Sequence, residues 1–167
     1  LLFWRRFVTQ RKCTLYAMPE VLADLWSSRL RGGMDTLMDA SGAKHPLALE
    51  DYCEVRPLVG THFMIGPLHV EWRPTIHHIA TSALRITARG RTFGYSADTA
   101  FDPTLIEWLA QSELFVHETN LGVHTPLASL LTLPETTRER MRVIHYPDFH
   151  DVDSSPISCA REGDRYT

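Results

Sequence analysis

The chain has 167 residues, a formal net charge of -3 at pH 7, and a hydrophobic fraction of 44%. This length suits one domain with a core of its own, and the charge gives no sign of the broad basic surface that nonspecific nucleic-acid binding requires. No apolar run approaches the roughly 20 residues of a membrane-spanning helix. Cys13, Cys53 and Cys159 lie far apart in no metal-binding spacing, which favours reduced thiols and a cytoplasmic protein.

The first third of the chain predicts a helix, a strand and a second helix. Apolar residues at helical spacing mark residues 2–8, and residues 14–17 read as a short strand. A second helix is expected to begin at Pro19 and to end at Gly32-Gly33, because proline suits a first helical position and glycine suits a helix end. Residues 34–46 are rich in turn formers and predict a surface connection or lid.

The middle of the chain predicts β-structure. Residues 52–58, 63–65 and 68–72 are short runs that favour strands and are separated by proline and glycine. Residues 82–87 and 91–95 flank Ala-Arg-Gly, which indicates a β-hairpin. The sequence therefore predicts several short strands in this region, two of them paired as a hairpin.

Helix and strand signals alternate in the last third. Asp102-Pro103 combines an N-cap side chain with proline at the first helical position and predicts a helix start. Residues 114–116 and 142–144 read as buried strands, and helices are expected from about Pro126 and after Pro134. This alternation favours an α/β layered domain.

Carboxylates and histidines follow these apolar runs at wide spacing. Asp98 follows the predicted hairpin, His117-Glu118 follows one buried strand, and His145 follows another. The pair His77-His78 and the later His124 add further imidazoles. Imidazole and carboxylate are common zinc ligands. The pattern predicts a metal site assembled from strand ends.

These motifs resemble those of the metallo-β-lactamase fold hydrolases, in particular ribonuclease Z and its bacterial phosphodiesterase relatives. Residues 96–99, Ser-Ala-Asp-Thr, are similar to the family's Gly-Asp-Thr element, whose aspartate bridges two metal ions. Residues 77–86 resemble the motif in which a metal-binding histidine precedes a strand. Residues 143–146 resemble the last motif, whose histidine closes the second metal site. The resemblance covers residues 75–148 closely and the flanks loosely.

Two further elements are similar to the ribonuclease Z branch. His117-Glu118-Thr119 resembles its His-Glu-Ala-Thr element, and His124-Thr125 resembles its downstream His-Ser-Thr. In that branch the glutamate and the second histidine form a relay near the scissile phosphate. The resemblance therefore implies that Glu118 orients His124, which protonates the leaving oxygen.

The resemblance also implies the metal ligands. These would be His77, Asp98 and His145, holding two divalent ions, expected to be zinc, with manganese or iron as alternatives. Whether His77 or its neighbour provides the ligand stays open. Three residues are expected beside the metal without binding it, namely His78, His117 and Thr99.

One family motif is missing. The signature His-x-His-x-Asp-His, which supplies most of the protein ligands in the family, occurs nowhere in the chain. We therefore expect an amino-terminally truncated member, with residues 1–167 forming a single incomplete domain. The predicted fold is α/β, a partial αββα sandwich lacking its amino-terminal strands. Metal is expected to bind weakly or not at all to this chain alone.

The resemblance implies a metal-dependent phosphodiesterase that uses a metal-bound hydroxide on a nucleotide or other phosphate diester. RNA is a further substrate that it allows, as is assembly into a homo-oligomer. Hydrolysis of an ester, lactone or thioester by the same metal centre is one alternative. A catalytically inactive module that keeps the fold for binding or assembly is another. The reading frame upstream of Leu1 would discriminate the enzyme from the inactive module, because the enzyme requires the missing His-x-His-x-Asp-His motif there.

Overall fold

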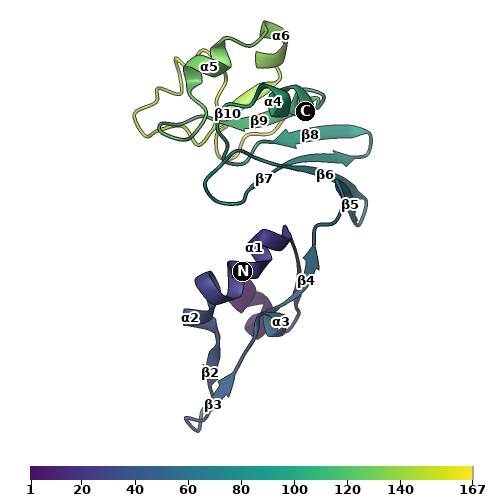
Figure 1. Ribbon diagram of the computed structural model, residues 1–167, viewed down its shortest axis with the longest axis vertical. Helices are drawn as coiled ribbons and strands as arrows, with labels where there is room; N and C mark the ends of the chain where they lie inside the picture. The colour runs from purple at the N-terminus through teal and green to yellow at the C-terminus, as the bar shows by residue number, and fades with distance from the viewer. Residues whose placement is uncertain (167) are drawn as a thin grey trace. The chain divides into compact units, whose positions relative to one another are not determined.

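The computed structural model describes residues 1–166. They divide into two compact units, Leu1–Gly60 and a second unit that begins at Thr61 (Figure 1). No helix within residues 1–166 is long and apolar enough to cross a membrane. A single incomplete domain over residues 1–167 stays a prediction.

The first unit is built from short elements around one buried tyrosine. Tyr52 is 1% exposed, lies edge-on against Phe3 and Phe7, and donates its hydroxyl to the carbonyl oxygen of Met34 at 2.8 Å. Strands β1 and β4 pair in parallel. In chain order the elements are the π-helical η1 (Trp4–Val8), β1 (Cys13–Ala17), α1 (Pro19–Asp24), the π-helical η2 (Leu25–Leu30), α2 (Arg31–Met34), β2 (Thr36–Met38), β3 (Lys44–Pro46), α3 (Leu49–Tyr52) and β4 (Cys53–Pro57).

The second helix ends one residue beyond the predicted Gly32-Gly33. Helical structure runs through both glycines to Met34, and the C-cap residue Asp35 has a φ of -82° rather than a left-handed conformation. The predicted strand over residues 52–58 also begins later. Tyr52 is the last residue of α3, whose first turn is capped by the Asp51 carboxylate accepting from the Ala48 backbone N–H at 2.8 Å.

Residues 36–46 are exposed, as the predicted surface connection over residues 34–46 requires, but the segment is more ordered than predicted. This segment contains the antiparallel hairpin of β2 and β3. Its turn closes on Asp39, whose Oδ1 accepts from the backbone N–H groups of Ser41 at 2.8 Å and Ala43 at 3.1 Å. Local side-chain hydrogen bonds of this kind favour a turn over a loose connection.

The second unit contains one mixed sheet with the order β10-β9-β8-β7-β6-β5. Strands β5 to β8 run antiparallel, whereas β8, β9 and β10 are parallel. The elements are β5 (His62–Ile65), β6 (Leu68–Pro74), β7 (Ser82–Ala88), β8 (Arg91–Tyr95), α4 (Pro103–Leu109), β9 (Leu114–Glu118), α5 (Leu127–Leu131), α6 (Glu135–Arg138) and β10 (Met141–Ile144). The predicted hairpin is confirmed as β7 and β8.

Helices α4, α5 and α6 lie on one side of this sheet (Figure 1). Between the helices and the sheet lies the hydrophobic core, which includes Ile106 and Leu109 of α4, Leu130 of α5, Phe115 of β9 and Val143 of β10. All five are at most 2% exposed. The mixed sheet and its helices confirm the predicted α/β class.

The parallel strands bring the candidate site together. The carboxyl ends of β8, β9 and β10 meet at the same edge of the sheet, where open α/β sheets bind ligands. Asp98 follows β8, Glu118 ends β9, and His145 follows β10. Residues far apart in the sequence therefore become neighbours at this edge.

Candidate functional site

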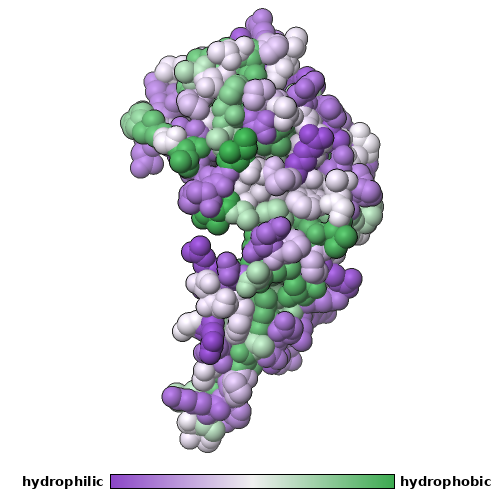
Figure 2. Space-filling view, in the orientation of Figure 1, coloured by the Kyte–Doolittle hydropathy of each residue, from purple (hydrophilic) through white to green (hydrophobic). Residues whose placement is uncertain are grey.

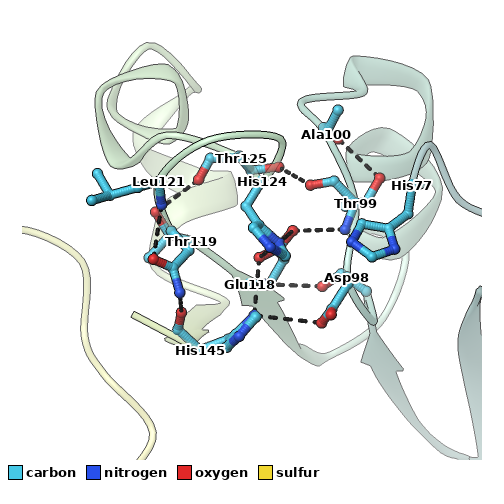
Figure 3. Close-up of polar contacts among 12 residues, drawn as sticks. His77, Asp98, Thr99, Ala100, Glu118, Thr119, Leu121, His124, Thr125 and His145 are labelled. Atoms are coloured by element: carbon cyan, nitrogen blue, oxygen red, sulfur yellow. Dashed lines mark hydrogen bonds and ion pairs between the residues drawn. The ribbon is translucent and has the colours of Figure 1, made fainter. Parts of the chain in front are cut away.

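Four side chains form a cluster at the carboxyl ends of the parallel strands. Asp98, Glu118, His124 and His145 each offer a ligand atom, and these atoms all lie within 4.8 Å of one another (Figure 3). His124 comes from the loop between β9 and α5. The structure thus brings together four of the residues that the sequence motifs predicted for the site.

Glu118 is the most enclosed member of this cluster, with 1% of its side chain exposed. Its Oε1 accepts the backbone N–H of Thr99 at 2.6 Å. The Nδ1 atom of His124 lies 3.0 Å from Oε1 and 2.9 Å from Oε2. On the other side, Oε2 lies 3.3 Å from Nδ1 of His145. An ionised carboxylate only accepts hydrogen bonds, so both imidazoles would carry a proton on the nitrogen that faces it.

His145 lies between the two carboxylates. Its Nδ1 is 3.4 Å from Oδ1 of Asp98, in addition to its contact with Glu118. The side-chain amide of Asn120 donates to the His145 carbonyl oxygen at 2.7 Å. His145 has a φ of 54°, and Ala97, which precedes Asp98, has a φ of 52°. Such left-handed conformations cost about 1 to 3 kcal/mol each and concentrate at functional sites.

His77 lies beside the cluster and outside its 4.8 Å limit. Its ring centroid is 5.3 Å from that of His124, and the ring of His78 lies against it at 4.1 Å. Nδ1 of His77 accepts a long hydrogen bond of 3.4 Å from the Ile79 backbone N–H. Its Nε2 atom is buried and has no hydrogen-bond partner among the described residues. His78 is exposed. These positions favour His77 over His78 as the ligand, which stays a prediction.

His117 is fully buried behind Glu118. Its Nδ1 lies 2.7 Å from the Glu118 carbonyl oxygen, so Nδ1 carries the proton and donates it. Burial lowers the pKa of His117, which favours the neutral ring. His117 is absent from the ligand cluster. Its predicted place beside the site, without binding metal, is untested.

The donor set fits a divalent metal ion. Two carboxylates and two imidazoles converge, and these groups match the oxygen and nitrogen ligands of zinc. The unpartnered Nε2 of His77 is a fifth candidate donor at the margin of the cluster. A metal ion bound at Nε2 would displace the proton from that atom. The proton of the neutral ring would then be on Nδ1, which could no longer accept the long hydrogen bond from the Ile79 backbone N–H.

Sequence reasoning missed the polar residues that support this cluster. Ser96 Oγ accepts the backbone N–H of Glu118 at 2.9 Å, and Thr125 Oγ1 donates to the Thr99 carbonyl oxygen at 3.0 Å. Tyr95 is 36% exposed, and the partial burial of its side chain, followed by the negative charges of Asp98 and Glu118, raises its pKa. Ser96 and Thr125 stand within two of the family motifs, but the resemblance gave neither of them a role. Three further supporting residues are Thr75, Thr81 and Asn120.

The family described as Anti-Pycsar protein Apyc1 matches residues 1–160 of the chain. The chain belongs to the Apyc1 family. The Apyc1 protein of Paenibacillus harenae is 32% identical over 158 residues, which cover 89% of this chain and 62% of that protein. The chain therefore spans less than two thirds of the length of this Apyc1 relative.

The fold of this Apyc1-family chain matches that of a solved structure. The metallo-β-lactamase fold protein YhfI of Bacillus subtilis superposes with a TM-score of 0.65 at 16% identity, over 91% of this chain and 60% of YhfI. This likeness confirms the metallo-β-lactamase fold predicted from the motifs. The cGMP-dependent 3′,5′-cGMP phosphodiesterase A of Dictyostelium discoideum is 23% identical over 128 residues, or 66% of this chain and 15% of that protein.

Proposed function

We propose that this chain belongs to a metal-dependent phosphodiesterase that hydrolyses a 3′,5′-cyclic nucleotide. The observation that carries the proposal is the convergence of Asp98, Glu118, His124 and His145 at the carboxyl edge of the sheet. It occurs in a chain of the Apyc1 family with a metallo-β-lactamase fold. The wider class, hydrolysis of a nucleotide or other phosphate diester, is the prediction that the motifs already supported.

In this proposal His77, Asp98 and His145 hold divalent metal ions. In the sequence, Asp98 lies between His77 and His145. It follows β8, and its Oδ1 atom lies 3.4 Å from Nδ1 of His145. Divalent ions bound there would supply Lewis acidity toward a phosphoryl oxygen and would lower the pKa of water. Zinc matches the nitrogen and oxygen donors, with manganese or iron as alternatives.

The proton-handling residues are Glu118 and His124. The Glu118 carboxylate is fixed by the Thr99 backbone N–H, so it can hold the His124 ring in one orientation through Nδ1. The other ring nitrogen, Nε2, is then the atom that delivers a proton to the leaving oxygen. A carboxylate partner stabilises the imidazolium form that this step requires.

The cyclic-nucleotide substrate is supported by the relatives and by the loops around the cluster. The Dictyostelium relative is named as a 3′,5′-cGMP phosphodiesterase. In the loop that carries His124, the adjacent Val123 is apolar and 55% exposed. Figure 2 shows apolar side chains at the surface of both units. Exposed apolar side chains close to a charged centre can contact a base while the centre contacts the phosphate.

The location and the remaining partners belong to the same proposal. The free cysteines, Cys13, Cys53 and Cys159, support a cytoplasmic protein with reduced thiols. We regard RNA as the secondary substrate and a small cyclic phosphodiester as the primary one. Association into a homo-oligomer is compatible with the exposed apolar residues.

The test is hydrolysis by the complete protein, loaded with zinc or manganese. Substrates are cAMP, cGMP, a single-stranded RNA and a p-nitrophenyl carboxylic ester. We expect turnover of a cyclic nucleotide that exceeds turnover of the other two by at least tenfold. Faster hydrolysis of the ester would favour the carbonyl alternative, and metal binding without any hydrolysis would favour the inactive module.

A His124→Ala variant tests the assignment of the proton donor. We expect kcat for the cyclic nucleotide to fall by about 100-fold or more, with metal content unchanged. His69→Ala is the matched control, because His69 lies on β6 outside the cluster. Full turnover by His124→Ala would remove His124 from the mechanism.

A further inference from the structure

Two threonines connect the loop that carries His77 to the backbone of Asp98. Thr75 and Thr81 stand at the two ends of this loop. Their hydroxyls donate to the Asp98 carbonyl oxygen at 2.7 Å and 3.0 Å, respectively. The Thr75 backbone N–H also donates to the Thr81 carbonyl oxygen at 3.1 Å, which closes the loop on itself. We call these two residues the threonine pair.

The threonine pair reaches the Asp98 carbonyl oxygen whichever way its two hydroxyl protons are oriented. The two hydroxyls of the threonine pair also contact each other, so three contacts share two hydroxyl protons. Either both hydroxyls donate to the Asp98 carbonyl, or one donates to the other and the second donates to the carbonyl. In each case at least one hydrogen bond reaches Asp98.

Backbone hydrogen bonds extend the connection past Asp98. The Ala100 N–H donates to the Ile76 carbonyl oxygen at 2.7 Å, and the Ile76 N–H donates to Thr99 Oγ1 at 3.3 Å. Asp98 is thus held on both sides, although Ala97 before it has an unfavourable φ of 52°. Such a strained residue persists only where its surroundings fix the conformation.

We propose that Thr75 and Thr81 are positioning residues that hold the His77 loop against the turn of Asp98, so that both predicted ligands keep their spacing for metal. This inference rests on the proposed function, because it takes His77 and Asp98 as ligands. It goes beyond that proposal, since neither threonine is among the predicted metal ligands or proton-handling residues. Partners behind the ligands commonly change metal affinity by about 10- to 100-fold.

The test compares zinc dissociation constants, measured by competition with a chromophoric chelator, for variants of the complete protein. Thr75→Val with Thr81→Val keeps the side-chain shape and removes both hydroxyls. We expect this double variant to bind zinc at least tenfold more weakly, and its Co²⁺-substituted form to show a changed visible spectrum. Restoring the hydroxyls with Thr75→Ser and Thr81→Ser should recover affinity and spectrum.

Thr87→Val is the matched control, because Thr87 and Thr92 form a similar hydroxyl contact of 3.1 Å in the β7–β8 hairpin. It should leave zinc affinity unchanged. If the double valine variant does not fold, Thr75→Ala with Thr81→Ala carries the test, since it also removes both hydroxyls. Unchanged affinity and spectrum in a folded double variant would overturn the inference. Absence of zinc binding by the unmodified protein would instead overturn the proposed function.

Discussion

Glu118 carries a carboxylate that is almost completely removed from solvent and contacts two histidines and one backbone N–H. Replacing it by glutamine keeps the size but removes the charge and leaves one accepting oxygen where the site uses two. We predict that Glu118→Gln lowers kcat of the complete protein by about 100-fold or more. Steady-state kinetics and metal analysis on the same sample measure this.

Glu113→Gln is the control for this substitution, because Glu113 is exposed and pairs with Arg91 at the opposite end of β9. It should retain full activity. A Glu118→Gln variant that keeps both metal and turnover would show that the carboxylate does not orient His124.

His117 makes a prediction about pH. Burial lowers its pKa in the folded state below the value near 6.5 of an unfolded histidine. As the pH falls through about 6.5, the unfolded chain therefore binds a proton at His117 that the folded chain does not bind. The free energy of unfolding is unaffected by His117 above about pH 6.5 and decreases below it, by at most about 1.4 kcal/mol per pH unit. We expect urea unfolding between about pH 7 and about pH 5 to show a steeper loss for the unmodified protein than for His117→Gln.

Glutamine suits this comparison because it can donate to the Glu118 carbonyl and does not titrate. Parallel pH profiles for the two proteins would contradict a lowered pKa for His117.

At the scale of the elements, Gly94 lets β8 approach α4. A Cβ atom there would lie 2.8 Å from Cβ of Phe115 and 3.1 Å from Cδ2 of Leu109. We predict that Gly94→Ala destabilises the protein by about 1 to 3 kcal/mol through overpacking, measured as the free energy of unfolding in urea. Gly32→Ala is the control, because Gly32 is helical and has no neighbour within 4 Å. It should be neutral or stabilising by up to about 1 kcal/mol.

The start of α4 depends on one side chain. Oδ1 of Asp102 accepts from the backbone N–H groups of Thr104 at 2.9 Å and Leu105 at 3.2 Å. We predict that Asp102→Ala costs about 1 kcal/mol of unfolding free energy, whereas Asp102→Asn, which can still accept, costs only a few tenths. Equal losses for alanine and asparagine in urea unfolding would contradict the capping role.

These elements also show what the sequence could predict about the fold. The β7–β8 hairpin and the start of α4 follow from local chemistry, namely turn residues between alternating strands and an N-cap before proline, and both predictions are confirmed. The Thr36–Pro46 hairpin was missed because it depends on hydrogen bonds to Asp39 that the turn-rich composition does not distinguish from a loop. The second helix ends only one residue after Gly33, although neither glycine takes the left-handed conformation on which that prediction rested.

The site residues also divide into those that the sequence could predict and those that it could not. Asp98, Glu118, His124 and His145 were found because each belongs to a motif, and parallel pairing then brings them together. The threonine pair was not found, because its members act through backbone atoms and have no distinctive residue type or spacing. Supporting contacts of this kind become visible only when the loops are placed in space.

At the scale of the whole molecule, the number of ligands limits metal affinity. Two ions that share Asp98 would have His77 on one side and His145 on the other, which gives each ion two protein ligands where catalytic zinc commonly has three. We predict that residues 1–167, prepared as one chain and dialysed, retain well under one zinc per chain by elemental analysis. His145→Ala should reduce the remainder further, whereas His69→Ala should leave it unchanged. Stoichiometric zinc that survives dialysis would mean that Glu118 or His124 also binds metal, and would require a different proton donor.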